Sequence, residues 1–114
     1  MSETRTPALG NLTDRIQLQR RVSTSEDEGG AIVTWSPLST VWARVRQLST
    51  RQGLAEDARG QAITHSVVLR FRLDVGPGDR LIYRGRTLDI AGAADLNGRR
   101  AYLSLQCVER AVTG

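Results

Sequence analysis

Period-two alternation of apolar and polar side chains is the feature that most limits how this chain can fold. Successive side chains of a β-strand point to opposite faces of a sheet, so such alternation predicts half-buried strands. The clearest run is residues 64–73, whose predicted core-facing set is His65, Val67, Leu69, Phe71 and Leu73. Three further runs predict the inward-facing sets Ile16, Leu18 and Val22, then Val41, Ala43 and Val45, then Leu103, Leu105 and Cys107.

Turn-forming residues separate these runs. Glycine and asparagine tolerate the positive φ of tight turns, and the turn signals are Glu28-Gly29-Gly30, Gly76-Pro77-Gly78-Asp79, Arg84-Gly85 and Asn97-Gly98. Pro37 lacks a backbone donor and is expected to end a short strand over residues 32–36. With short strands also expected over 80–84 and 87–91, the pattern predicts an all-β fold. We expect a small closed or partly open β-barrel or sandwich of about seven antiparallel strands with one long loop.

The 114 residues suffice for one domain. We expect a flexible N-terminal arm over residues 1–11, the β-barrel over 12–110 and a C-terminal tail over 111–114. No apolar stretch approaches the ~20 residues of a membrane span, and the first ten residues lack the apolar core of a secretory signal. We therefore expect a protein made in the cytoplasm that does not associate with a membrane.

The chain offers little material for catalysis. It has one histidine, His65, and one cysteine, Cys107, which excludes an internal disulfide and a cluster of cysteine ligands. Gly76 and Gly78 lack the lysine and the helix that follow in a phosphate-binding loop, and no nucleophile elbow is present. We expect no catalytic residue, no metal site and no cofactor, and we expect His65 at the core or its boundary.

Arginine and tryptophan supply the candidate interface residues. All 16 basic residues are arginines, and the formal net charge is +4. Arginines at outward strand positions form either a solvated barrel wall or an interface with DNA phosphates or acidic neighbouring proteins. The two tryptophans flank Pro37 and either pack over the open end of the barrel or anchor a neighbouring subunit. The candidate interface residues are Trp35, Trp42, Arg44, Arg46, Arg70 and Arg72.

Residues 49–61 break the alternation and contain two glycines, Gly53 and Gly60. Loops of this length are uncommon inside compact domains. The stretch is either a solvated surface loop or a projecting loop that reaches a neighbouring subunit or a central channel. Its candidate channel, DNA-contact or ring-contact residues are Arg51, Gln52, Leu54, Glu56, Asp57 and Arg59.

Several segments occur in an order and spacing that together carry a resemblance over residues 12–109. They are DRIQLQR at 14–20, GG at 29–30, VTW at 33–35, TVWARV at 40–45, LS at 48–49, THSV at 64–67, LRFR at 69–72, PGDRL at 77–81, YRGRTLDI at 83–90 and YLSLQCVE at 102–109. In these segments the chain resembles the phage head-tail joining protein family, whose members are also described as head-tail adaptor or stopper proteins.

The resemblance implies a small β-barrel with a long loop and without catalytic residues. It also implies a homo-oligomeric ring of six or twelve copies in a phage or gene transfer agent particle. Portal and adaptor proteins would lie above that ring, the tail terminator below it and double-stranded DNA in its channel, where some members retain packaged DNA.

Two other classes of function stay open on the sequence alone. The first is a stand-alone nucleic-acid-binding small β-barrel, although single-strand binding needs aromatic platforms and the chain has only five aromatic residues, two Trp, two Tyr and one Phe. The second is a hydrolytic enzyme, because a catalytic triad is recognised by geometry rather than by sequence. Such an enzyme would lose its activity when His65 is changed.

Overall fold

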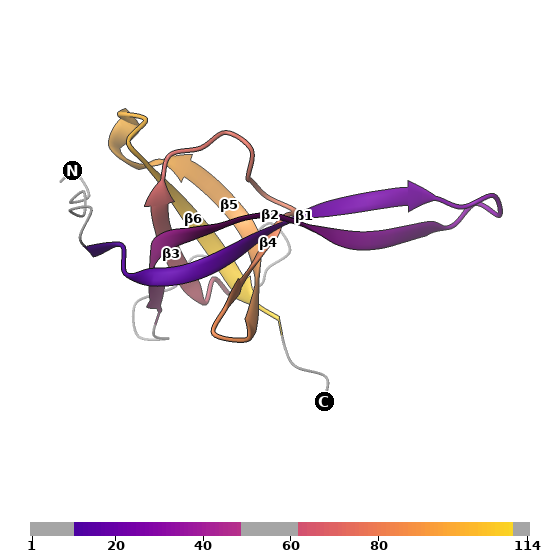
Figure 1. Ribbon diagram of the computed structural model, residues 1–114, viewed down its shortest axis with the longest axis horizontal. Helices are drawn as coiled ribbons and strands as arrows, with labels where there is room; N and C mark the ends of the chain where they lie inside the picture. Colours follow the sequence, from indigo (N-terminus) through magenta and orange to yellow (C-terminus); the bar gives the residue numbers. More distant parts are fainter. Residues whose placement is uncertain (1–10, 49–61, 111–114) are drawn as a thin grey trace.

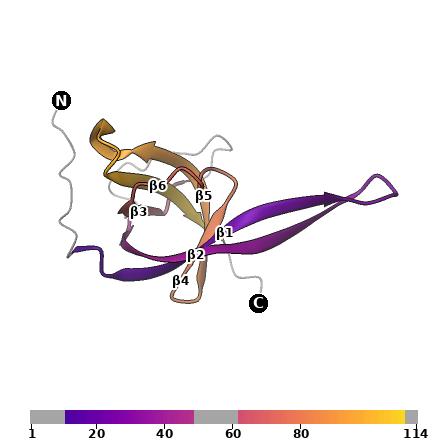
Figure 2. The same cartoon turned by 45° about the horizontal axis from the view of Figure 1, so that its top comes forward.

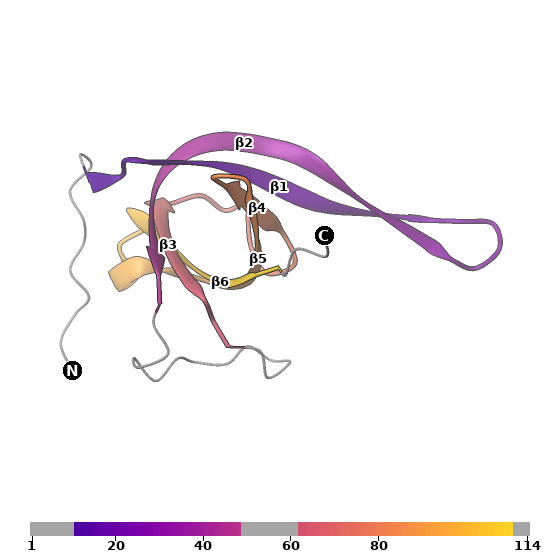
Figure 3. The ribbon, with the colours of Figure 1, turned by 90° about the horizontal axis from the view of Figure 1, so that it is seen from below.

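The computed structural model describes residues 11–48 and 62–110, which form a closed six-stranded antiparallel β-barrel (Figure 1). The strands are hydrogen-bonded in the order β1-β2-β3-β6-β5-β4, and β4 pairs with β1 to complete the ring, which Figure 3 shows from below. The predicted all-β fold is therefore confirmed. The elements are β1 (Asp14–Ser25), β2 (Ala31–Gln47), β3 (His65–Arg70), β4 (Arg80–Tyr83), β5 (Arg86–Asp95), the 3-10 turn η3 (Leu96–Gly98) and β6 (Tyr102–Glu109).

The core is built from the inward face of the alternation. Antiparallel pairing places β2, β3 and β6 side by side, so their inward side chains meet in layers, as where Val67 lies opposite Leu105. Closing the sheet leaves these strands with few exposed edges. The buried cluster comprises Ile16, Leu18, Ala43, Val67, Leu69, Val75, Leu81, Leu88, Ile90, Leu103, Leu105 and Cys107.

His65 is buried, in agreement with the core or boundary position expected from the sequence. Its Nδ1 lies 2.9 Å from the Thr64 hydroxyl, and its Nε2 lies 4.0 Å from a Glu109 carboxylate oxygen. Burial lowers the pKa of His65, the charge of Glu109 opposes this effect, and the charge of Arg86 adds to it. The folded protein therefore holds His65 in its neutral form near neutral pH.

This lowered pKa predicts a loss of stability on mild acidification. As the pH falls through the pKa of unfolded His65, the unfolded chain binds a proton that the folded chain does not, so the free energy of unfolding decreases until the folded pKa is reached. Urea unfolding at about pH 7.5 and about pH 5.5 should show a larger decrease for the wild type than for His65→Gln, which has no titrating ring. Equal decreases in the two proteins would contradict this prediction.

The prediction that Pro37 ends a strand is wrong, because β2 runs through it without interruption. A register shift places Gln19 of β1 opposite Pro37 and Leu18 opposite Ser39, which leaves Leu38 as the extra residue of a bulge. A sheet tolerates proline beside a bulge and on a strand edge that no other strand occupies. Among the described residues, β2 pairs with β3 only from Ala43 onward. Two predicted strands thus merge, and the barrel has six strands rather than seven.

Two residues predicted to face the core are exposed. Val22 has 38% of its surface exposed, because β1 has by then passed the bulge and left the barrel. Leu73 has 79% of its surface exposed, because β3 ends at Arg70 and Leu73 lies in the connection to β4. Alternation alone does not show where a strand leaves the barrel.

The turn predictions are largely confirmed. Positive φ occurs at Gly29 in the β1–β2 turn, and at Arg84 and Gly85 in the two-residue β4–β5 turn. Asn97 and Gly98 also have positive φ, as predicted, but they lie in a longer β5–β6 connection rather than in a two-residue hairpin.

Candidate functional site

The first two strands extend beyond the barrel as a two-stranded ribbon, residues 20–36, here named the arm (Figure 1 and Figure 2). Within the described part of the chain, β1 pairs with β4 only through Gln19, and β2 pairs with β3 only from Ala43. The arm lies along the longest axis of a molecule whose extents are 52 × 29 × 27 Å. Its cross-strand pairs from Arg20–Ser36 to Ser25–Ala31, at ~3.3 Å per residue, give it a reach of about 20 Å.

The arm exposes apolar side chains on both faces: Val22 at 38%, Ile32 at 49% and Val33 at 41%. Val22 lies opposite Thr34 and Ile32 opposite Thr24, so Val22 and Ile32 are diagonal neighbours on one face. A two-stranded hairpin is marginally stable in water by itself. Apolar side chains gathered on such an element are typical of a surface that another molecule covers.

The tip of the arm is acidic. It carries Glu26, Asp27 and Glu28 in succession, all exposed. The turn is closed by backbone hydrogen bonds from Glu26 N to Gly30 O at 2.9 Å and from Gly29 N to Glu26 O at 3.1 Å. The arm therefore presents an apolar ribbon that ends in three carboxylates.

The root of the arm is packed against the barrel by Trp35. The guanidinium of Arg80 lies 4.2 Å from the centroid of the Trp35 ring, and that of Arg110 lies 5.9 Å from it. Arg110 is in turn paired with Asp89 at 3.3 Å. Burial lowers the pKa of Arg80, and the charge of Arg110 lowers it further. Each cation–π contact contributes about 0.5–1 kcal/mol at partly exposed positions.

Two hydrogen bonds link the other strand of the root to the loop that precedes β4. The backbone N–H of Arg21 donates to Asp79 Oδ1 at 3.3 Å. The guanidinium of Arg20 donates to the carbonyl oxygen of Asp74, also at 3.3 Å. These contacts and the Trp35 stack set the direction in which the arm leaves the barrel.

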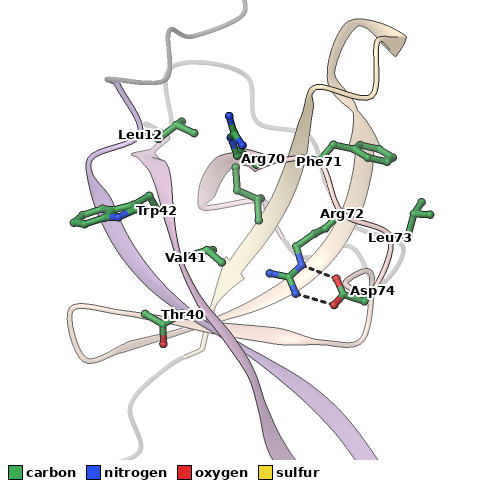
Figure 4. A pocket seen from close by; sticks show the side chains of 10 residues that line it. Leu12, Thr40, Val41, Trp42, Arg70, Phe71, Arg72, Leu73 and Asp74 are labelled. Atoms are coloured by element: carbon green, nitrogen blue, oxygen red, sulfur yellow. Dashed lines mark hydrogen bonds and ion pairs between the residues drawn. The ribbon is translucent and has the colours of Figure 1, made fainter.

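A pocket opens where β2 and β3 separate (Figure 4). The β2–β3 ladder ends with Ala43 opposite Leu69, and the chain after Arg70 turns away from β2. The resulting space has a volume of about 680 Å³. It is lined by Leu12, Thr40, Val41, Trp42, Leu69, Arg70, Phe71, Arg72, Leu73 and Asp74.

The pocket combines exposed apolar side chains with a basic rim. Trp42 has 52% of its surface exposed, and Leu73, with 79% exposed, lies on the opposite side of the pocket in Figure 4. The guanidinium of Arg15 lies 4.8 Å from the centroid of the Trp42 ring. Arg72 donates to both carboxylate oxygens of Asp74, at 2.5 and 2.7 Å, and this contact lowers the pKa of the Asp74 carboxyl.

The six candidate interface residues do not form one cluster. Trp42, Arg70 and Arg72 come together at the pocket. Arg44 and Arg46 are exposed farther along the outer face of β2. Trp35 stacks on Arg80 at the root of the arm, whereas Trp42 stacks on Arg15 at the pocket, so the two tryptophans do not share one packing site.

The candidate loop residues lie outside the described part of the chain, as do the predicted C-terminal tail and most of the predicted N-terminal arm. These loop residues are Arg51, Gln52, Leu54, Glu56, Asp57 and Arg59.

Within residues 11–48 and 62–110, no cluster of His, Cys, Asp and Glu side chains is placed to hold a metal ion. No helix in those ranges is both long and apolar enough to cross a membrane.

Sequence reasoning missed the arm and the pocket as surfaces. One signal for the arm was present: Ala31, Ile32 and Val33 are consecutive apolar residues, which a strand with one solvated face would not contain. For the pocket, the sequence gives no comparable signal, because it depends on where the β2–β3 ladder stops.

Comparison with known proteins finds one family model, described as phage head completion protein, that matches residues 8–110. Head completion protein gp7 of Enterobacteria phage HK97 is 25% identical over 103 residues, which cover 86% of this chain and 92% of that protein. The solution structure of protein SF1141 from Shigella flexneri 2a has a TM-score of 0.71 at 29% identity, covering 90% of this chain and 96% of that one. A chain of the virion of a native gene transfer agent particle has a TM-score of 0.60 at 25% identity, covering 84% and 93%.

Proposed function

Because this chain belongs to the phage head completion protein family, we propose that it is a structural subunit of the head-tail connector in a phage or gene transfer agent particle. In this proposal, several copies form a ring between the portal and adaptor proteins and the tail, and the ring retains packaged DNA. The copy number of six or twelve, and a channel contact by residues 51–59, stay predictions. The role is mechanical rather than enzymatic.

The observation that supports this role most directly is the arm. A barrel of this size does not need a ribbon of about 20 Å that exposes Val22, Ile32 and Val33 to solvent. The ribbon is nevertheless held in a set direction by Trp35 and Arg80. A fixed, apolar projection is suited to docking with neighbouring subunits in a particle, and the structural likeness to a gene transfer agent virion chain is consistent with that use.

Removing this chain from a particle-producing cell tests the proposal. We expect heads that package DNA but carry no tail and lose their DNA, because the joint between head and tail would be missing. Electron microscopy counts tailed particles, and nuclease treatment measures the DNA that stays protected. Expression of the wild-type chain in the same cells should restore both. Tailed particles with protected DNA in its absence would refute the proposal.

A second candidate function, DNA binding by the isolated barrel, is favoured by one specific observation. Arg44, Arg46 and Arg70 are exposed on the same outer face of adjacent strands. Binding to duplex DNA measured at several salt concentrations distinguishes the two functions. Tight binding by the monomer with a steep salt dependence would favour the DNA binder, whereas weak binding together with particle association favours the connector.

A further inference from the structure

We propose that the arm of one copy docks in the pocket of a second copy, with the Val22–Ile32 face against Trp42 and Leu73 and the acidic tip beside Arg70. The inference rests on the proposed function, because it identifies the contact that would join neighbouring subunits in the ring. Three properties of the described residues support it: the direction of the arm, the match of apolar surfaces and the match of charges.

The direction of the arm prevents it from filling the pocket of its own chain. Asp74 lines the pocket, and its carbonyl oxygen accepts a hydrogen bond from Arg20 at the root of the arm. The pocket therefore lies beside the root, while the tip projects away from the barrel (Figure 1). Since the Trp35 stack and the Arg21–Asp79 hydrogen bond hold the root, the tip can enter only the pocket of another copy.

Both surfaces expose apolar side chains. The arm is a narrow projecting ribbon, and the pocket is an open hollow of about 680 Å³ between β2 and the segment after β3. Val22 and Ile32 on the ribbon are exposed, as are Trp42 and Leu73 at the pocket. Docking would remove all four from water, and burial of apolar surface is the main favourable contribution to most protein association.

The charges are complementary as well. The tip carries Glu26, Asp27 and Glu28, and the arm has no arginine beyond Arg21. At the pocket, Arg72 is already neutralised by Asp74, but Arg70 is exposed and forms no ion pair with another described residue. An acidic tip beside Arg70 would satisfy this guanidinium and fix which end of the ribbon enters the pocket.

The arm and the pocket are different surfaces of one chain, so the contact between them is heterologous. Contacts of this type close into rings when the rotation between neighbours divides a full turn. Each docked arm would bury a modest area, but a closed ring holds every arm at a high effective concentration. A contact that is weak between two free subunits is therefore sufficient in the assembled ring.

Intermolecular paramagnetic relaxation in the full-length protein tests the docking and detects even weak contacts. Ser25 is exposed on the arm face opposite Val22 and Ile32, so Ser25→Cys carries a nitroxide without blocking the proposed contact. Cys107 is buried, and burial raises the pKa of its thiol to about 12, so the label is restricted to the introduced cysteine. Nitroxide-carrying protein without isotope enrichment is mixed with nitroxide-free protein enriched in ¹⁵N. We expect broadening of the Trp42 indole N–H signal and of the amide signals of residues 70–74.

Two controls make this result specific. A nitroxide on Ala94→Cys, which is exposed on β5 and pairs with Ser104 of β6 rather than with the arm, should leave these signals sharp. Arg70→Glu in the ¹⁵N-enriched protein should abolish the broadening, and Glu26→Arg with Glu28→Arg in the nitroxide-carrying protein should restore it. Sharp Trp42 and residue 70–74 signals with Ser25→Cys would overturn the proposal. Sharp signals that shift instead when duplex DNA is added would overturn it too, and would identify the pocket as a DNA contact.

The experiment separates failure of the docking from failure of the proposed function. It uses free protein and reports only on the contact between arm and pocket. Particles that need this chain for tail attachment, but whose free subunits show no broadening, would leave the connector role intact and refute the docking alone.

Discussion

Replacing Leu105 by alanine is expected to lower the free energy of unfolding by about 2–5 kcal/mol, the usual cost of a cavity at a buried leucine. Leu105 is fully buried in the core cluster, and it lies opposite Val67 on β3 and Ala93 on β5. It therefore packs at the centre of the sheet, where neighbouring strands cannot close the space left behind. Small domains have a total stability of about 5–15 kcal/mol, so this loss is a large fraction of the whole.

Leu73→Ala provides the matched control. The chemical change is the same, but Leu73 has 79% of its surface exposed, so we expect a change within about 0.5 kcal/mol. Urea unfolding followed by circular dichroism measures both variants under one set of conditions. Similar losses for the two leucines would contradict the assignment of Leu105 to the core and of Leu73 to the surface.

Removing the arm should abolish head-tail joining while leaving the barrel folded. Arg21 and Trp35 form a cross-strand pair at the root, so residues 22–34 can be replaced by the two-residue turn Asn-Gly, which suits a tight hairpin. The barrel retains every residue of its core cluster, and we expect its thermal midpoint to shift by no more than about 4–8 °C, the effect of about 1 kcal/mol in a domain of this size.

Assembly should respond much more strongly than stability. If the arm contributes about 3 kcal/mol to each contact between subunits, its removal weakens that contact by more than about 100-fold. Electron microscopy of particles made with the shortened chain measures the fraction that carries tails. Thr24→Ser with Thr34→Ser keeps the arm and its exposed apolar residues, and it should support normal joining. Normal numbers of tailed particles from the shortened chain would show that the arm is dispensable.

Local patterns predicted the barrel well, because the forces that produce it are local. Alternation placed Ile16 and Leu18 on the inward face of β1, and both residues are buried. Glycine at positions that need positive φ predicted the β1–β2 and β4–β5 turns. These signals depend only on how one residue relates to its near neighbours along the chain.

The arm and the pocket could not be predicted in the same way, because each depends on where pairing with a third strand stops. Val22 continues the alternation of β1, yet it is exposed, since β4 pairs with β1 only through Gln19. Leu73 continues the alternation of β3, yet β3 ends at Arg70. Pro37 is a further example in which a local signal failed. Proline usually ends a strand, but β2 continues through Pro37 because a bulge and an unoccupied strand edge coincide there.

The bulge at Leu38 has a geometric consequence for any ring that is built by docking of the arm. Bulges bend a strand and increase its local twist, and this one lies where β1 and β2 leave the barrel. The bend and the Trp35–Arg80 stack together set the angle between an arm and its own barrel. In a closed ring, that angle helps to fix the rotation from one subunit to the next, so the symmetry order of the assembly would depend on a single extra residue and one stacked tryptophan.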